Sequence, residues 1–139
     1  MHTLTLRTYY KDTDAEGVVY YANYLAYFEA GRMEYFRDLG ISIKELKENF
    51  GVVFAVRNVE CDYLAPALLD DQLTISTEVE TIEGVRVIFK QSAALSKREG
   101  AQASGQTLVS GVITLVALDY KTFKPVRIPP PIMDKVKSK

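Results

Sequence analysis

The sequence predicts one α+β domain over residues 1–139, in which an antiparallel sheet packs against a single long helix. The first observation is the order of patterns along the chain: a strand, a long helix, a short helix and then four strands. The second is the length, since one domain runs to roughly 100–200 residues. The third is the composition, because 47% hydrophobic and 25% charged residues are typical of a compact globular domain.

Hydrophobic periodicity predicts the first strand and the long helix. Residues 3–10 alternate around Leu4 and Leu6 and are rich in threonine and tyrosine, which favours a strand. From Ala22 to Leu39 the apolar residues recur at helical spacing, and Gly40 ends the helix. The first half of this helix is apolar on nearly all sides, so we expect the core to enclose it.

A short second helix and four strands follow. Ser42-Ile43-Lys44-Glu45 has the form of a capping box, which predicts a helix to about Asn49 that Gly51 closes. Strand patterns then cover residues 52–64, 72–82, 85–98 and 106–119, and we expect them to form an antiparallel meander.

Two further features concern the C-terminal part of the chain. Val109–Leu118 is apolar on both faces, which indicates a central strand. Lys124–Pro131 contains four prolines, which remove hydrogen-bond donors, so we expect an extended strap there rather than another strand.

The charge and composition exclude several classes of function. A formal net charge of −1 provides no basic field for nucleic acid or for an anionic membrane surface. No apolar run approaches the roughly 18 residues that suggest a membrane-spanning helix, so we expect no membrane insertion. The single cysteine, Cys61, cannot form an intramolecular disulfide, and the N-terminal residues lack a secretory pattern. We therefore expect a cytoplasmic protein.

The most informative segment is residues 10–24, which brings two carboxylates and a glycine to the start of the long helix. A carboxylate at the positive end of a helix can attack a carbonyl or deprotonate water while free backbone N–H groups hold a developing oxyanion. Asp14 is the candidate nucleophile or base, and its alternative is a turn or capping aspartate. Asp12 has a supporting role only, on the same side as Asp14 if the segment is extended, and its alternative is a loop aspartate hydrogen-bonded to local backbone. Gly17 permits a positive φ or a close approach of substrate.

The chain resembles the hotdog-fold acyl-CoA thioesterases of the 4-hydroxybenzoyl-CoA thioesterase family over almost its whole length. Residues 10–24 match the pattern Tyr-x-Asp-x-Asp-x-x-Gly-x-Val-Tyr-x-x-x-Tyr. The chain is most similar to the branch often encoded beside the Tol-Pal envelope system. That branch commonly has histidine where this chain has Tyr21, and the aryl-CoA branch has tyrosine there. The resemblance continues at Phe28-Glu29, Arg32, Tyr63, Pro66-Ala67, Asp70-Asp71 and Arg127-Ile128-Pro129.

The resemblance implies a curved antiparallel sheet of about five strands wrapped around one central helix. It implies an acyl-CoA substrate, Asp14 as the catalytic carboxylate and the Tyr21 backbone N–H as the oxyanion donor. Coenzyme A is part of the substrate, so no cofactor is expected. It also implies a homodimer with shared active sites, often within a homotetramer. Unpaired strand edges and an incompletely covered helix independently favour a symmetric dimer.

The sequence offers further candidate site residues besides the Asp14 carboxylate and the Tyr21 backbone N–H. Gly17, Val18, Tyr20 and Tyr24 could line an acyl pocket, although aromatic residues at an enclosed helix start are more often core residues. Arg86 and Lys90 share one face of a strand and could contact coenzyme A phosphates, whereas the alternative is a solvated strand face. Glu29 and Arg32 have the spacing of a helix-surface ion pair.

Several chemistries are not supported by the sequence. His2 is the only histidine and lies at the end of the chain, which argues against a histidine-dependent triad or dehydratase. Cys61 is expected to be a small buried apolar residue, and no residue spacing suggests a metal site. The remaining alternative to a hydrolase is a module that binds an acyl-CoA or an acyl carrier protein without hydrolysis.

Overall fold

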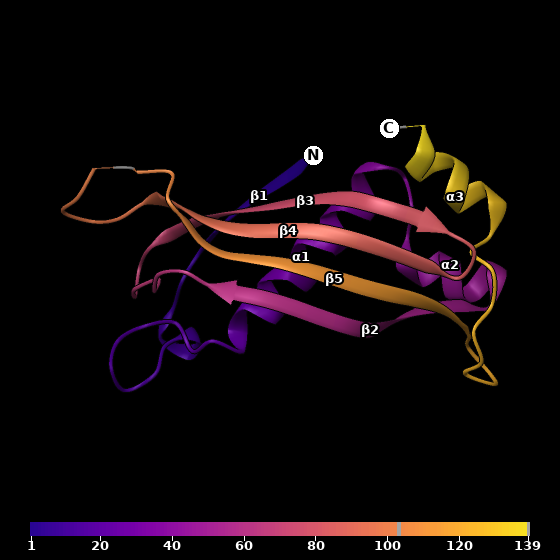
Figure 1. Ribbon diagram of the computed structural model, residues 1–139, viewed down its shortest axis with the longest axis horizontal. Helices are drawn as coiled ribbons and strands as arrows, with labels where there is room; N and C mark the ends of the chain where they lie inside the picture. Colours follow the sequence, from indigo (N-terminus) through magenta and orange to yellow (C-terminus); the bar gives the residue numbers. More distant parts are fainter. Residues whose placement is uncertain (103, 139) are drawn as a thin grey trace.

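The computed structural model describes residues 1–102 and 104–138. Figure 1 shows α1 crossing behind the sheet, with α2 and α3 together at the end opposite the loop of residues 8–22. The elements in chain order are β1 (His2–Arg7), the 3-10 helix η1 (Tyr10–Asp12), α1 (Asn23–Asp38), α2 (Ile43–Phe50), β2 (Val52–Tyr63), β3 (Gln72–Glu83), β4 (Arg86–Lys97), β5 (Thr107–Asp119) and α3 (Pro130–Lys137).

The five strands form one antiparallel sheet in the order β1-β3-β4-β5-β2. Only β3, β4 and β5 are consecutive neighbours, so the expectation of a meander from residue 52 onward is wrong for β2. That strand pairs with β5 and forms an edge of the sheet. The prediction of a central strand at Val109–Leu118 is confirmed, because β5 lies between β4 and β2.

A β-bulge in β2 sets which of its side chains face α1. Phe54 stacks on Phe36 of α1, and the Cys61 sulfur lies 3.1 Å from the place where a Cβ on Gly111 would be, on the same side of the sheet. Residues seven apart share one face of a strand only if an extra residue is inserted between them. The register shift after Val56 supplies that residue.

The core lies between α1 and the sheet. Phe28, Phe36 and Phe89 are almost fully buried, and Gly31 allows the helix to approach β3 closely. A Cβ at Gly31 would lie only 2.7 Å from the Thr77 hydroxyl.

A buried polar group in this core joins the helix to the sheet. Gln91 Nε2 donates to the Phe28 carbonyl and to the Thr77 hydroxyl, at 2.8 Å each, and Arg32 Nη1 donates to Gln91 Oε1 at 3.0 Å. The side-chain pair expected between Glu29 and Arg32 is not among the salt bridges of the described residues, because Arg32 turns inward to the sheet.

The first half of α1 is not enclosed, contrary to the expectation from its apolar sequence. Leu25 is 41% exposed, and Met33 two turns later is 38% exposed. Ala26 and Glu29 are exposed on the same side of the helix. One chain therefore buries the sheet-facing side of α1 and leaves an opposite, largely apolar stripe uncovered.

Both ends of the chain differ from the prediction. β1 ends at Arg7, and His2 is part of it, with Nε2 3.0 Å from the Asp38 carboxylate. The C-terminal strap exists only in part: Val126 N–H donates to the Ala117 carbonyl at 2.9 Å, but α3 starts at Pro130. Prolines are compatible with the first turn of a helix, because the N–H groups there have no intrahelical partner.

The predicted helix ends are confirmed. Gly40 follows α1 with a φ of +76°, and Gly51 closes α2 with a φ of +66°, so both occupy the left-handed region that terminates helices. The Ser42 hydroxyl accepts a hydrogen bond from the Glu45 N–H at 3.2 Å. The reciprocal bond of a full capping box is not found among the described residues.

Candidate active site

Asp14 starts a tight turn in the loop before α1. The Asp14 N–H donates to the Val18 carbonyl at 2.9 Å, and the Gly17 N–H donates to the Asp14 carbonyl at 3.0 Å. Gly17 has a φ of +82°, which confirms the predicted need for a glycine. Asp14 Oδ1 accepts a hydrogen bond from the Glu16 N–H at 2.9 Å. Its other oxygen accepts none from the described residues, so the half-buried carboxylate keeps one free oxygen.

Asp12 does not lie beside Asp14 as an extended segment would place it, because η1 turns its side chain inward. The carboxylate is buried and accepts hydrogen bonds from the Tyr9 N–H at 2.8 Å and from Lys11 Nζ at 2.7 Å. Burial raises the pKa of Asp12, but these hydrogen bonds and the Lys11 charge outweigh burial and hold the pKa below its ordinary value. The main-chain carbonyl of Asp12 accepts from the Tyr20 N–H at 2.9 Å. Asp12 therefore holds the loop in place.

Tyr27 lies beside this carboxylate within α1. It is buried, and its hydroxyl has no hydrogen-bond partner among the described residues. Burial and the neighbouring Asp12 charge raise the pKa of Tyr27, so its hydroxyl stays protonated.

The start of α1 carries two unpartnered N–H groups. The first helical residue is Asn23, whose N–H donates to the Tyr20 carbonyl at 2.9 Å. The N–H groups of Tyr21 and Ala22 donate to no acceptor among the described residues, and both residues are exposed. They lie at the positive end of a 16-residue helix, where the helix dipole favours negative charge. The Tyr21 N–H was predicted for this role, whereas the Ala22 N–H was not.

An aromatic cavity of about 280 Å³ adjoins these N–H groups. Three of its lining residues are tyrosines in mutual contact. The centroid of the Tyr63 ring lies 6.0 Å from that of Tyr21 and 5.9 Å from that of Tyr24. The Tyr24 hydroxyl accepts a hydrogen bond from the Ala67 N–H at 3.3 Å, and burial raises the pKa of Tyr24. The lining residues are Val19, Tyr21, Tyr24, Tyr63, Leu64, Ala65 and Pro66.

The structure brings only some of the predicted residues to this cavity. Tyr21 and Tyr24 line it, whereas Asp14, Gly17 and Val18 lie in the adjoining turn and Tyr20 is exposed. The wall formed by residues 63–66 was not assigned to the site from the sequence. The available signal was the apolar run Leu64-Ala65-Pro66 after a strand.

Arg86 and Lys90 do not reach the cavity within one chain. Arg86 lines a separate groove of about 510 Å³ with Arg57 and Phe123. Lys90 lines another groove, where its ammonium is 3.9 Å from a Glu80 carboxylate oxygen.

Within residues 1–102 and 104–138, no three histidine, cysteine, aspartate or glutamate side chains are grouped so as to hold a metal ion. Over the same described residues, no helix combines the length and apolar character needed to cross a bilayer.

The fold and the site define the class of protein. Residues 10–136 match the profile of the thioesterase-like superfamily, and the chain belongs to that family. The expected hotdog fold, a five-stranded antiparallel sheet around a long helix, is confirmed.

Individual relatives agree with this family. The acyl-CoA thioesterase YbgC of Haemophilus influenzae is 36% identical over 89% of this chain and 85% of its own length. The acyl-CoA thioester hydrolase YbgC of Escherichia coli O157:H7 is also 36% identical, over 95% of this chain and 92% of its own.

Solved structures show the same fold. A probable thioesterase from Bartonella henselae superposes with a TM-score of 0.80 at 32% identity, over 92% of this chain and 98% of its own. A 1,4-dihydroxy-2-naphthoyl-CoA thioesterase from Synechocystis superposes with a TM-score of 0.85 over 97% of this chain and 94% of its own. Its 18% identity shows a shared fold alone.

Proposed function

We propose that this acyl-CoA thioesterase hydrolyses small acyl- or aryl-CoA thioesters, with Asp14 as nucleophile or general base and the Tyr21 N–H as oxyanion donor. The observation that carries the proposal is the pair of unpartnered N–H groups at the start of α1 beside the aromatic cavity. A cavity of about 280 Å³ suits a short or aromatic acyl group.

In the general-base route, Asp14 removes a proton from water and the resulting hydroxide adds to the thioester carbon. In the covalent route, the Asp14 carboxylate adds directly to the thioester carbon, expulsion of the coenzyme A thiolate leaves a mixed anhydride, and water hydrolyses that anhydride to the free acid and the Asp14 carboxylate. In both routes the carbonyl oxygen gains negative charge, which the N–H groups of Tyr21 and Ala22 stabilise. The carbon–sulfur bond then breaks, and the coenzyme A thiolate takes up a proton.

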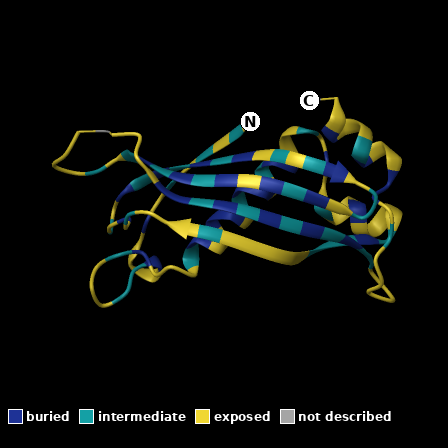
Figure 2. Ribbon diagram, viewed as in Figure 1, coloured by how far each residue is buried: buried dark blue, intermediate teal, exposed yellow. Residues whose placement is uncertain are grey.

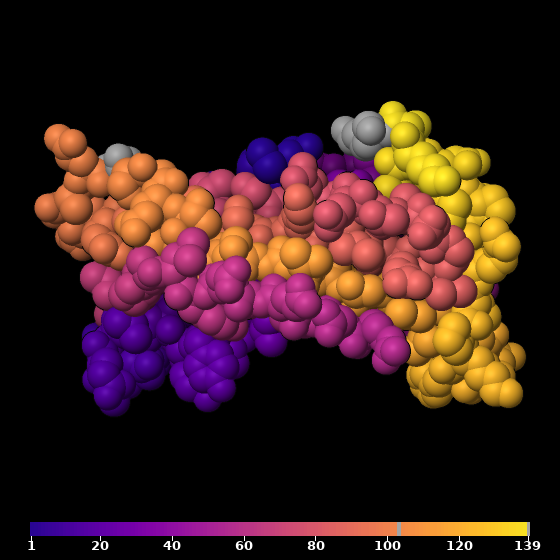
Figure 3. Space-filling model, viewed as in Figure 1, coloured from indigo at the N-terminus to yellow at the C-terminus, as the bar shows by residue number. Residues whose placement is uncertain are grey.

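The proposed active form is a homodimer. β2 is a 12-residue edge strand whose middle is exposed, as Figure 2 shows, and α1 carries an uncovered, largely apolar stripe. Figure 3 shows β2 in a recess between the lobe of residues 8–22 and the turn of residues 119–125. Antiparallel pairing of two β2 strands would bury both edges and both stripes. Assembly of two dimers into a tetramer stays a prediction.

This pairing supplies a role for Arg86. Antiparallel pairing would place the Val52 end of one β2 beside the Tyr63 end of the other, and the groove of Arg57 and Arg86 lies toward the Val52 end. We therefore propose that Arg86 contacts the coenzyme A phosphates across the dimer. Lys90 is a weaker candidate, because Glu60, Asp62 and Glu80 surround it with negative charge.

Thiol release from a panel of acyl-CoAs tests the proposal. Replacing Asp14 with asparagine keeps the shape of the turn and removes the base, so turnover should fall at least about a hundredfold. Glu16→Gln is the matched control, because it removes a carboxylate from the same turn and keeps the backbone N–H that donates to Asp14, while the Glu16 side chain has no hydrogen bond or salt bridge among the described residues. Near-normal turnover in Asp14→Asn would contradict the assignment.

The rival function is an acyl-CoA or acyl-carrier-protein binding module. It is favoured by the hydrogen bond from the Glu16 N–H to Asp14, which gives that carboxylate a structural reason to be present. A binder would hold acyl-CoA with measurable affinity and release no thiol. The same thiol-release assay with an acyl-loaded carrier protein distinguishes a carrier-protein substrate from a coenzyme A substrate. The cytoplasm stays the proposed location, in keeping with the single unpaired Cys61.

A further inference from the structure

The loop between β2 and β3, residues 64–71, contacts both parts of the candidate site. Its first residues form the cavity wall. Its middle holds the segment before α1: the Val19 N–H donates to the Ala67 carbonyl at 2.9 Å, and Val18 forms a β-bridge with Leu68. The position of this loop therefore fixes the cavity wall and the approach to the Tyr21 N–H together.

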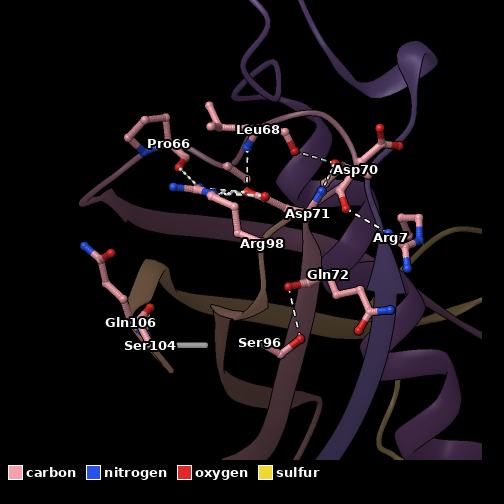
Figure 4. A network of polar contacts seen from close by, with 12 residues as sticks. Arg7, Pro66, Leu68, Asp70, Asp71, Gln72, Ser96, Arg98, Ser104 and Gln106 are labelled. Carbon is pink, nitrogen blue, oxygen red and sulfur yellow. Dashed lines mark hydrogen bonds and ion pairs between the residues drawn. The ribbon is translucent and has the colours of Figure 1, made fainter. Parts of the chain in front are cut away.

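The far end of the loop is held by a buried carboxylate. Asp71 is only 1% exposed, and its Oδ2 accepts a hydrogen bond from the Leu68 N–H at 2.8 Å. Thr8 adds a second tie, since its hydroxyl donates to the Leu68 carbonyl at 2.6 Å and accepts from the Asp71 N–H at 3.1 Å. Figure 4 shows Leu68, Asp70 and Asp71 in this loop, with Asp71 turned toward Leu68.

The loop conformation is strained and depends on such ties. Asp70 has a φ of +68°, a left-handed conformation that is unfavourable for a residue other than glycine. Arg7 Nη1 donates to the Asp70 carbonyl at 2.9 Å, and the Asp70 N–H donates to the Thr8 carbonyl at 3.2 Å. A strained residue persists only where its surroundings hold it.

Arg98, just after β4, connects this end of the loop to the cavity wall. Its Nε donates to both oxygens of Asp71, at 3.0 and 3.2 Å, and its Nη2 donates to Asp71 Oδ2 at 2.7 Å. The same Nη2 lies 3.4 Å from the Pro66 carbonyl oxygen as donor. Arg98 is the one cation that forms a salt bridge with Asp71 within the described part of the chain. The planar guanidinium suits this forked contact, which a lysine cannot reproduce.

We propose that Arg98 and Asp71 are a positioning pair for thioester hydrolysis, which holds the 64–71 loop so that the cavity wall and the Tyr21 N–H keep their alignment. This inference rests on the proposed function. Neither residue lines the cavity, so the pair acts through Pro66, Ala67 and Leu68. Loss of the pair should misplace the acyl group relative to the N–H donors, and a displacement of about 1 Å can cost on the order of a hundredfold in rate.

The kinetic test compares Arg98→Met with Lys97→Met. Both remove one positive charge at neighbouring positions, but Lys97 is exposed and its side chain has no hydrogen bond or salt bridge among the described residues. We expect kcat to fall at least about tenfold in Arg98→Met, with KM changed less than about threefold. Arg98→Lys should recover part of kcat, and Lys97→Met should match the wild type. Wild-type kcat in folded Arg98→Met would overturn the proposal.

A second measurement does not depend on turnover. Amide hydrogen exchange followed by NMR should become at least about tenfold faster at Val19 in Arg98→Met, because its acceptor is Ala67. The Tyr20 amide, bonded to the Asp12 carbonyl, is the internal control and should be unchanged.

Unchanged exchange at Val19 would overturn the positioning role even if the wild type hydrolyses acyl-CoA. Faster exchange in a protein that releases no thiol would instead reject the proposed function alone. If Arg98→Met does not fold, Asp71→Asn replaces it, because asparagine keeps an acceptor for the Leu68 N–H while removing the charge. The same outcomes apply to that variant.

Discussion

Asp12 and Asp14 are two residues apart, yet their surroundings separate their roles. Asp12 is buried, bonded by Lys11 and by the Tyr9 N–H, and cannot meet a substrate. Asp14 keeps one free oxygen in an accessible turn that leads to the start of α1. The same side chain is therefore structural at one position and the proposed catalytic group at the other, because only Asp14 remains accessible.

Asp12 should make stability depend on acid pH. Its pKa in the folded protein lies below the ordinary value of about 3.9, so its contribution is present above that value and is lost as pH falls through the folded pKa. The free energy of unfolding, measured with urea between about pH 6 and pH 2.5, should therefore decrease toward acid. Asp12→Asn should show a shallower decrease. Equal pH dependence in both proteins would contradict this role.

Gly31→Ala should destabilise the fold although alanine is the better helix former. A Cβ would lie 2.7 Å from the Thr77 hydroxyl and 3.0 Å from Gln91 Nε2, inside the buried polar group. Overpacking costs roughly 1–3 kcal/mol and helix propensity returns up to about 1 kcal/mol, so we expect a net loss of about 1–2 kcal/mol. Ala26→Gly, on the exposed side of α1, is the control, because it measures the free-energy difference between alanine and glycine in this helix without a packing clash. Unchanged or higher stability of Gly31→Ala in denaturant unfolding would contradict close packing here.

At the scale of secondary-structure elements, α1 and α2 differ in whether the backbone N–H groups at their N-termini have hydrogen-bond acceptors. α2 begins with the Ser42 hydroxyl bonded to the Glu45 N–H, so one of its early donors is satisfied. α1 has no such side-chain cap, and the N–H groups of Tyr21 and Ala22 just before it stay unpartnered among the described residues. A capped helix start is stable, whereas an uncapped one can bind an anion.

Ser42→Ala should therefore destabilise the protein by about 1 kcal/mol, the usual cost of a lost N-cap. Ser42→Asp is the control, because it keeps an acceptor oxygen and favours the helix dipole. Thermal unfolding of the two variants measures the effect. A Ser42→Ala protein as stable as the wild type would show that the 3.2 Å contact contributes nothing.

At the scale of the whole molecule, one chain leaves several large apolar side chains uncovered. The bulge in β2 turns Val56 and Val59 to the α1 side, where they are 53% and 37% exposed. Val56 and Val59 lie along an unpaired strand edge, and Leu25 and Met33 of α1 are also exposed apolar side chains. Exposed apolar residues and an unpaired strand edge favour association with a second copy.

Light scattering at micromolar concentration should give the mass of a dimer or of a larger even-numbered assembly. Val59→Lys with Met33→Lys should shift the protein to monomer, because each buried charge would lack a partner. Arg37→Glu farther along α1 is exposed and serves as a charge-changing control. If the proposed function holds, the monomeric variant should also lose thiol release. A fully active wild-type monomer would contradict the shared site.

Local residue choices were sufficient to predict much of this fold. Helical spacing placed the long helix within one residue at each end of α1, Asn23–Asp38. Glycine, which tolerates a positive φ, marked the turn at Gly17 and the end of α2 at Gly51. The long β5 was recognisable as a central strand because it is apolar on both faces. Each of these signals depends only on neighbours in the chain.

Other features required the folded molecule. No local sequence feature distinguishes pairing of β2 with β5 from pairing of β2 with β3, because both strands offer the same kind of backbone N–H and carbonyl groups. The exposure of α1 depends on which side the sheet covers. The tie between Arg98 and Asp71 joins positions 27 apart, and the cavity brings the segment before α1 to the end of β2. Periodicity cannot reveal contacts of this kind.

The sequence by itself determined the class of fold, the family and the two groups proposed for catalysis, because spacing, turn chemistry and one dense motif carry that information. The tertiary structure alone decided that Asp12 is internal, that Asp14 stays accessible, and that the buried Asp71 carboxylate pairs with Arg98 at the end of the loop of residues 64–71. The physical reason is that burial and long-range hydrogen bonds are properties of packed segments, and they exist only after distant parts of the chain meet.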